Sequence, residues 1–124
     1  MKTVLLLGVG RSTHTLIKYL INSRRELNID IVLADQFSNA FVNSYVNKNK
    51  CRFLPIDINN NELRRREISK SDLVISMLPP KFHILVAKDC VEFKKNLITA
   101  SYVSDEIQKL DSDAKRSNIL ILNE

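Results

Sequence analysis

The sequence predicts an α/β domain, a doubly wound parallel sheet of about six strands, over residues 1–124. Short apolar runs alternate with stretches of helical spacing along the chain, which is typical of βαβ units. The runs are continuous in Val, Ile and Leu, so they suit strands that helices cover on both faces. The first run leads directly into a Gly-x-Gly turn and an amphipathic helix. No repeat or flexible linker follows, which indicates one domain with right-handed crossovers.

The strands are predicted from apolar runs that are too short for helices and are bounded by turn residues. Each run is rich in Val, Ile, Leu or Phe, and it would be buried on both faces of the sheet. The predicted strands are 3–7, 30–34, 52–56, 73–78, 96–101 and 119–122.

The helices are predicted from apolar residues at helical spacing between these runs. The stretch 12–23 places Leu16, Ile17 and Leu20 on one face. The next four open near residues that favour helix starts, namely Asn, Asp or a proline pair. They are 39–46, 61–68, 82–93 and 105–114.

The glycine turn matches the first two positions of a dinucleotide-binding fingerprint. Gly8 permits a tight turn, and Gly10 lets the backbone approach a pyrophosphate. The helix predicted from Ser12, with Arg11 just before it, directs unpaired N–H groups and its positive dipole end at the phosphates. The third fingerprint position, usually Gly or Ala, is Thr13. The glycines alone are therefore a weak indication, and the strand and helix around them strengthen it.

Asp35 supplies the acidic residue of the same fingerprint. It ends the second predicted strand, 22 residues after Thr13, close to the usual spacing of about 20. A carboxylate there accepts bonds from ribose hydroxyls and repels a 2′-phosphate, which favours NAD over NADP. Gln36 follows instead of a phosphate-binding arginine, although Arg11 could reach the same region. The alternative is that Asp35 is only a turn residue.

Residues after the later strands extend the predicted cleft, because ligands of such sheets lie beyond the carboxyl ends of the strands. Asp57 could meet the adenine amino group, or it could be a turn or capping residue. The rigid Leu78-Pro79-Pro80 segment would pass beside the nicotinamide ribose, or it could simply end a strand. The segment 99–102 (Thr-Ala-Ser-Tyr) presents polar groups suited to a carboxamide or a polar substrate.

The two histidines and two cysteines are expected to be structural. His14 and His83 have no carboxylate or cysteine at a useful spacing, so we expect packed or capping roles. Cys51 and Cys90 form neither a CxxC pair nor a Cys/His cluster, which indicates buried thiols and no metal site.

Composition limits the partners. The net charge is +5, but the basic residues lie on different predicted elements without interleaved aromatics, so we expect no nucleic-acid binding. No apolar run reaches the roughly 20 residues of a membrane span, and no secretory leader is recognisable, so we expect no membrane contact and a cytoplasmic location. The chain stops after the last strand, where an α/β enzyme would continue, so we expect the substrate domain to be absent from this chain.

Three segments identify a resemblance to a known family. These are 72–88 (DLVISMLPPKFHILVAK), 98–104 (ITASYVS) and 119–124 (ILILNE). They resemble the saccharopine dehydrogenase family, specifically the amino-terminal Rossmann domain of its glutamate-forming branch. The resemblance implies hydride exchange between NAD(P) and the secondary amine of saccharopine, a reaction of lysine metabolism. The imine formed would be cleaved by water to glutamate and aminoadipate semialdehyde.

The resemblance also implies roles for residues. The pyrophosphate would meet Val9 to Ser12, the adenosine ribose Ala34 to Gln36, and the adenine Asp57 and Ile58. The nicotinamide half would meet Leu78, Pro79, Thr99 and Ala100, and the amino acid substrate would meet Ser101 and Tyr102. Many family members have a Ser-Arg pair for NADP where this chain has Asp35-Gln36, so the coenzyme preference stays open. Residues that complete catalysis would belong to the missing domain, as would any homodimer contact.

Two alternatives remain from the sequence. A related enzyme could act on another imine adduct, such as carboxynorspermidine. A non-catalytic nucleotide-sensing module would share the fold and the coenzyme site without turnover.

Overall fold

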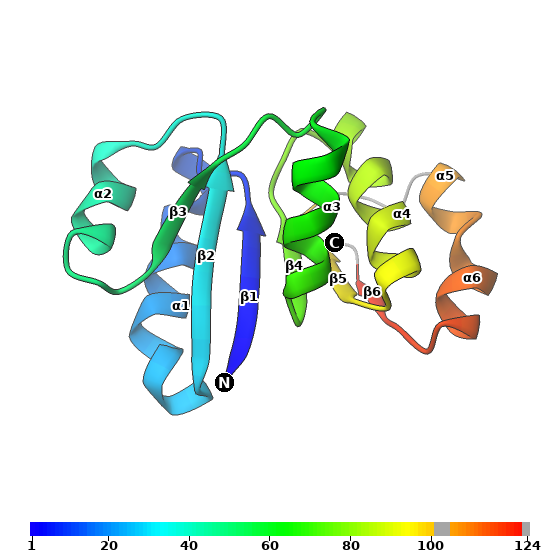
Figure 1. The fold of residues 1–124 in the computed structure, drawn as a ribbon, viewed down its shortest axis with the longest axis horizontal. Helices are drawn as coiled ribbons and strands as arrows, with labels where there is room; N and C mark the ends of the chain where they lie inside the picture. The colour runs from blue at the N-terminus through cyan, green and yellow to red at the C-terminus, as the bar shows by residue number, and fades with distance from the viewer. Residues whose placement is uncertain (101–104, 123–124) are drawn as a thin grey trace.

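The computed structural model describes residues 1–100 and 105–122, and it contains a six-stranded, entirely parallel sheet. The strand order is β3-β2-β1-β4-β5-β6, so the direction of winding reverses between β1 and β4. Figure 1 shows α1 and α2 beside β1 to β3, and the later helices beside β4 to β6. The predicted fold class is confirmed. The strands are β1 (Lys2–Leu7), β2 (Ile29–Asp35), β3 (Arg52–Pro55), β4 (Leu73–Ser76), β5 (Asn96–Thr99) and β6 (Ile121–Leu122).

The helices lie between the strands, as the sequence predicts. Two of them are preceded by a single 3-10 turn, at Arg11–Thr13 and at Pro80–Phe82. The α-helices are α1 (His14–Leu27), α2 (Ala40–Val46), α3 (Asn61–Lys70), α4 (His83–Phe93), α5 (Asp105–Gln108) and α6 (Asp111–Arg116). No helix among residues 1–100 and 105–122 is long and apolar enough to cross a membrane.

The core is divided by the sheet into two layers, which explains the continuous apolar runs. Leu5 and Leu7 of β1 pack in the cluster that contains residues of α3 and α4. Val4 and Leu6 of the same strand pack with residues of α1 and α2 on the other face. Successive side chains of a strand point to opposite faces, so a strand covered on both sides needs an apolar residue at every position.

Several predicted boundaries were wrong. The first α-helix covers His14–Leu27 rather than 12–23, and β5 covers Asn96–Thr99 rather than 96–101. The stretch 105–114 is two short helices rather than one: the Leu110 N–H bonds to the Ile107 carbonyl three residues earlier (3.0 Å), and Leu110 is the residue that precedes the second helix. The fourth strand ends at Ser76, since the following prolines cannot donate to the sheet. The last strand covers only Ile121–Leu122 within the described residues.

Candidate functional site

The glycine turn follows β1, and its two glycines have different reasons to be glycine. Gly8 has a φ of +99°, and a Cβ added there would lie 3.0 Å from the backbone carbon and oxygen of Met77. Its N–H donates to the Ala34 carbonyl at 2.8 Å, which ties the turn to the end of β2. Gly8 is therefore required by the fold itself.

Gly10 is not required by the fold. Its φ is −64° with an extended ψ of 174°, which any residue can adopt. A Cβ added at Gly10 would meet no atom within 4 Å, so the space beside the backbone is open. That open space suits a group that must approach the main chain closely, as the sequence predicts for a pyrophosphate.

The start of the first helix presents unpaired backbone donors. The N–H groups of Gly10, Arg11 and Ser12 have no hydrogen-bond partner among residues 1–100 and 105–122. Thr13, at the third fingerprint position, is buried, and its hydroxyl donates to the Gly10 carbonyl at 2.6 Å. Threonine therefore fits at this position, and the N–H groups that have no partner in the described chain are donors of the kind that an anion at a helix start can use.

The Asp35 carboxylate accepts hydrogen bonds from the glycine turn and from its own loop. Its Oδ2 accepts a bond from the Val9 N–H at 2.8 Å, and its Oδ1 accepts one from the Gln36 N–H at 2.7 Å. These bonds fix the carboxylate at the end of β2. Each carboxylate oxygen has capacity for a further donor, so the group can still accept bonds from ribose hydroxyls.

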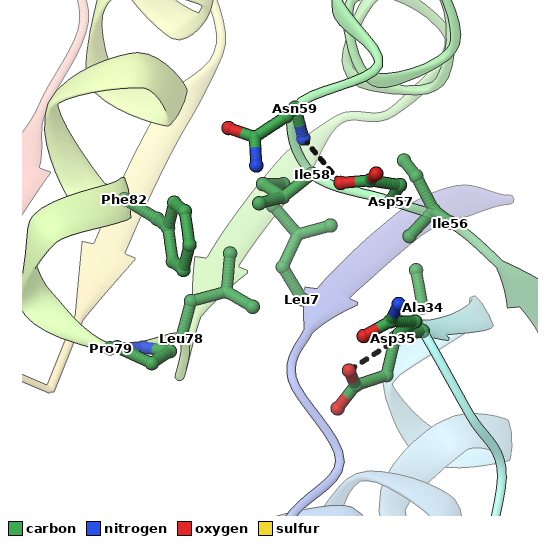
Figure 2. A pocket seen from close by; sticks show the side chains of 11 residues that line it. Leu7, Ala34, Asp35, Ile56, Asp57, Ile58, Asn59, Leu78, Pro79 and Phe82 are labelled. Atoms are coloured by element: carbon green, nitrogen blue, oxygen red, sulfur yellow. Dashed lines mark hydrogen bonds between the residues drawn. The ribbon is translucent and has the colours of Figure 1, made fainter.

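A cavity of about 410 Å³ lies beyond the carboxyl ends of β1 to β4. Figure 2 shows Phe82 and Pro79 on one side of it and Asp35 and Asp57 on the other. The cavity is lined by Leu7, Ala34, Asp35, Gln36, Ile56, Asp57, Ile58, Asn59, Leu78, Pro79 and Phe82. In the described part of the chain these walls contain two carboxylates and no Lys, Arg or His.

The structure thus brings seven predicted site residues together around one cavity. They are Ala34, Asp35, Gln36, Asp57, Ile58, Leu78 and Pro79. The loop from Gly8 to Ser12 lies outside the cavity lining, as do Thr99 and Ala100 at the end of β5. Thr99 is buried and is in register with Ser76 of β4. Ser101 and Tyr102 lie outside the described residues.

The loop after β3 combines turn and cavity roles. Asp57 accepts a bond from the Asn59 N–H at 2.9 Å, so the turn interpretation of Asp57 is confirmed. The capping interpretation is wrong, because Asn60 caps α3. Buried Arg64 donates to the Ile58 carbonyl at 2.9 Å and pairs with buried Asp89 of α4 at 2.5 Å, which anchors the loop to the helical layer.

Sequence reasoning missed four cavity residues. Leu7 and Ile56 were recognised only as strand residues, although strand ends in a parallel sheet face the ligand edge. Asn59 lies between the predicted strand 52–56 and the predicted helix 61–68, and it was not predicted as a site residue. Phe82 follows the double proline, and only the 3-10 turn directs it into the cavity (Figure 2).

The histidines and cysteines have the packed roles that the sequence predicts. His83 is buried beside the Ser76 hydroxyl, with Nδ1 and Oγ 2.9 Å apart, and burial lowers its pKa. His14 stacks on Phe41. Cys51 and Cys90 are both buried free thiols, and burial raises the pKa of Cys90 to about 12. None of the four lines the cavity.

Comparison with known proteins adds a family match. Residues 4–122 match the family model described as the saccharopine dehydrogenase NADP binding domain. The chain is 45% identical to an alpha-aminoadipic semialdehyde synthase of Arabidopsis thaliana over 56% of this chain and 6% of that protein. It is 32% identical to the saccharopine dehydrogenase [NADP(+), L-glutamate-forming] of Pyricularia oryzae, over 99% of this chain and 26% of that protein.

A solved structure agrees with these matches. The apo saccharopine dehydrogenase (L-Glu forming) from Saccharomyces cerevisiae superposes on all of this chain with a TM-score of 0.86, at 25% identity. The superposition covers 27% of that protein. The chain therefore spans about a quarter or less of the length of these relatives.

Proposed function

Since the chain belongs to the family of saccharopine dehydrogenase NADP-binding domains, we propose that it holds the nicotinamide coenzyme of a dehydrogenase that acts on the C–N bond of an amino acid adduct. Saccharopine, an intermediate of lysine metabolism, is the substrate that the names of the relatives suggest. The observation that carries the proposal is the open backbone at Gly10, together with three N–H groups that have no partner among residues 1–100 and 105–122. This arrangement fits a pyrophosphate.

The residues of the site have proposed roles along the coenzyme. The loop from Val9 to Ser12 binds the pyrophosphate through its N–H groups. Asp35, flanked by Ala34 and Gln36, accepts the ribose hydroxyls, and Asp57 with Ile58 borders the adenine. Leu78, Pro79, Thr99 and Ala100 lie toward the nicotinamide half. Ser101 and Tyr102 are proposed to reach the amino acid substrate, by the family resemblance alone.

We propose that the chain prefers NAD to NADP, unlike the curated relative whose name specifies NADP(+). Asp35 occupies the end of β2, and Asp57 lines the same cavity, which has no Lys, Arg or His among its described lining residues. A 2′-phosphate placed there would meet two carboxylates in a partly desolvated site. Arg11 is the nearest candidate in the sequence for neutralising such a phosphate.

The nicotinamide, when bound, supplies the carbon that accepts or donates a hydride. The residues of this chain contribute binding and orientation of that coenzyme. The general acid or base and the groups that bind the substrate carboxylates are proposed to come from residues outside this chain.

A calorimetric titration of the chain with NADH and NADPH at matched salt tests the proposal. We expect NADH to bind more tightly than NADPH. Tighter binding of NADPH would refute the role of Asp35, and binding of neither would refute the coenzyme site in this chain. Full-length protein should then reduce NAD⁺ with saccharopine and water, releasing glutamate and aminoadipate semialdehyde, and tight NADH binding without turnover would favour a sensing module.

A further inference from the structure

The peptide groups of Val9 are held on both sides by side chains that follow β2. The Val9 N–H donates to Asp35 Oδ2 at 2.8 Å, and the Val9 carbonyl accepts a bond from Asn39 Nδ2 at 2.9 Å. Val9 itself is 1% exposed. The middle of the glycine turn is therefore bound to a segment 26 to 30 residues later in the chain.

Asn39 uses both ends of its amide at once. Its Oδ1 accepts a bond from the Val42 N–H at 2.9 Å and so caps α2. Its Nδ2 donates to Val9. Only one orientation of the amide satisfies both contacts, because one partner is a donor and the other an acceptor. Asn39 thus caps α2 and at the same time holds the Val9 carbonyl, a contact that we call the tether.

A second contact joins the same two regions. The ring of His14, the first residue of α1, stacks on Phe41 of α2 with centroids 4.0 Å apart and an interplanar angle of 7°. Phe41 in turn meets Tyr45 edge to face at 5.2 Å. The start of the short helix α2 therefore contacts both the glycine turn, through Asn39, and the start of α1, through Phe41. The hydrogen bond from Asn39 to Val9 is thus supported by a ring contact beside it.

The tether acts on the peptide that carries the Gly10 N–H. The Val9 carbonyl and the Gly10 N–H belong to one planar trans peptide and point in opposite directions. Fixing the carbonyl on Asn39 therefore fixes the direction of the N–H. A bond to the carbonyl also polarises the peptide and strengthens its N–H as a donor.

We propose that Asn39 is a positioning residue that aims the Gly10 N–H at the pyrophosphate of the coenzyme, an inference that rests on the proposed function. Asn39 need not touch the coenzyme. Its effect reaches the ligand through the peptide between Val9 and Gly10, and it is separate from the role of Asp35 toward the ribose.

The variants Asn39→Ser and Asn39→Asp separate the tether from the cap. Ser and Asp cap helices about as well as Asn, but neither supplies the amide donor to the Val9 carbonyl. Ser adds no charge, so it distinguishes a lost tether from repulsion of the phosphates by Asp. Asn60 offers a matched control, because it caps α3 through Leu63 N–H at 3.1 Å and its NH₂ has no partner in the described chain.

Binding is measured with NADH, NADPH and adenosine, which lacks a pyrophosphate. We expect Asn39→Ser to weaken the binding of the preferred dinucleotide about fivefold to tenfold, because one hydrogen bond to a charged phosphate would have poorer geometry. Adenosine binding should be unchanged, and Asn60→Ser should match the parent chain. Unchanged dinucleotide affinity in Asn39→Ser, an equal loss for adenosine, or an equal loss in Asn60→Ser would each overturn the inference.

The chain contains two glycines, so glycine-selective ¹⁵N labelling reads the tether directly. The Gly10 amide signal should shift in Asn39→Ser, because the Val9 carbonyl of the same peptide loses its hydrogen bond from Asn39. The signal should stay in place in Asn60→Ser, because Asn60 makes no contact with that carbonyl. An unmoved Gly10 signal overturns the tether even in a chain that binds no dinucleotide. Absence of binding by the parent chain would instead refute the proposed function.

Discussion

Replacing Gly10 with valine should abolish tight dinucleotide binding while leaving the fold stable. The backbone at Gly10 is extended, and an added Cβ meets nothing within 4 Å. The free energy of unfolding should therefore change by about 0.5 kcal/mol or less, as for an exposed substitution without strain. The valine side chain would occupy the space from which a pyrophosphate reaches the free N–H groups.

The loss of affinity can be estimated from those N–H groups. A hydrogen bond to a charged group contributes about 1.5–3 kcal/mol. Losing two of them would weaken binding by about 3 kcal/mol or more, which is roughly 100-fold or more in Kd.

Gly8→Ala is the matched comparison, because the same turn should respond in the opposite way. An L-residue at φ +99° is strained, and its Cβ would lie 3.0 Å from the Met77 backbone, which cannot move as a side-chain end can. We expect a loss of about 2 to 4 kcal/mol in the free energy of unfolding, from backbone strain and overpacking together.

Urea denaturation followed by circular dichroism measures the stability of both variants, and calorimetric titration with NADH and NADPH measures binding. The reasoning would be refuted by a Gly10→Val chain that binds like the parent chain, or by one that unfolds as easily as Gly8→Ala. It would also be refuted by a Gly8→Ala chain of unchanged stability.

Three further predictions concern single side chains. Asp35→Ala should weaken the binding of NADH and strengthen the binding of NADPH. The ratio of the two affinities should shift about tenfold if one contact worth about 1.4 kcal/mol is involved. An unchanged ratio in the calorimetric titration would count against the ribose role of Asp35. Arg64→Leu should cost about 3–5 kcal/mol in urea denaturation, because Asp89 would remain buried without its partner, and the double variant Arg64→Leu with Asp89→Leu should recover part of the loss. Burial lowers the pKa of His83 from 6.5, so the unfolded chain binds more protons below about pH 6.5 and stability should fall as the pH drops through that range. His83→Gln should flatten that acid dependence in denaturation curves at several pH values, and an equally steep fall would contradict the assignment.

The sequence was sufficient for the fold class and for part of the site, because those features are local. Continuous apolar runs, helical spacing and cap residues each depend on a few neighbouring residues, and they placed the six strands and the helices between them in the right order along the chain. The positions of Gly8, Gly10 and Asp35 followed from spacing in the same way. The single helix expected over 105–114 was wrong: the structure has two helices, which meet where the Leu110 N–H bonds to the Ile107 carbonyl, and the helical spacing of the sequence does not show that break.

The sequence by itself determined that strands and helices alternate, that a glycine turn follows the first strand and that an acidic residue ends the second. Only the tertiary structure decided that the ends of β1 to β4 enclose one cavity, because that depends on the strand order and on pairing between distant residues. It also decided which glycine the fold needs and which leaves open space. The Asn39 tether to Val9 could not be read from the sequence for the same physical reason: two residues 30 positions apart meet only when the helices have packed against the sheet.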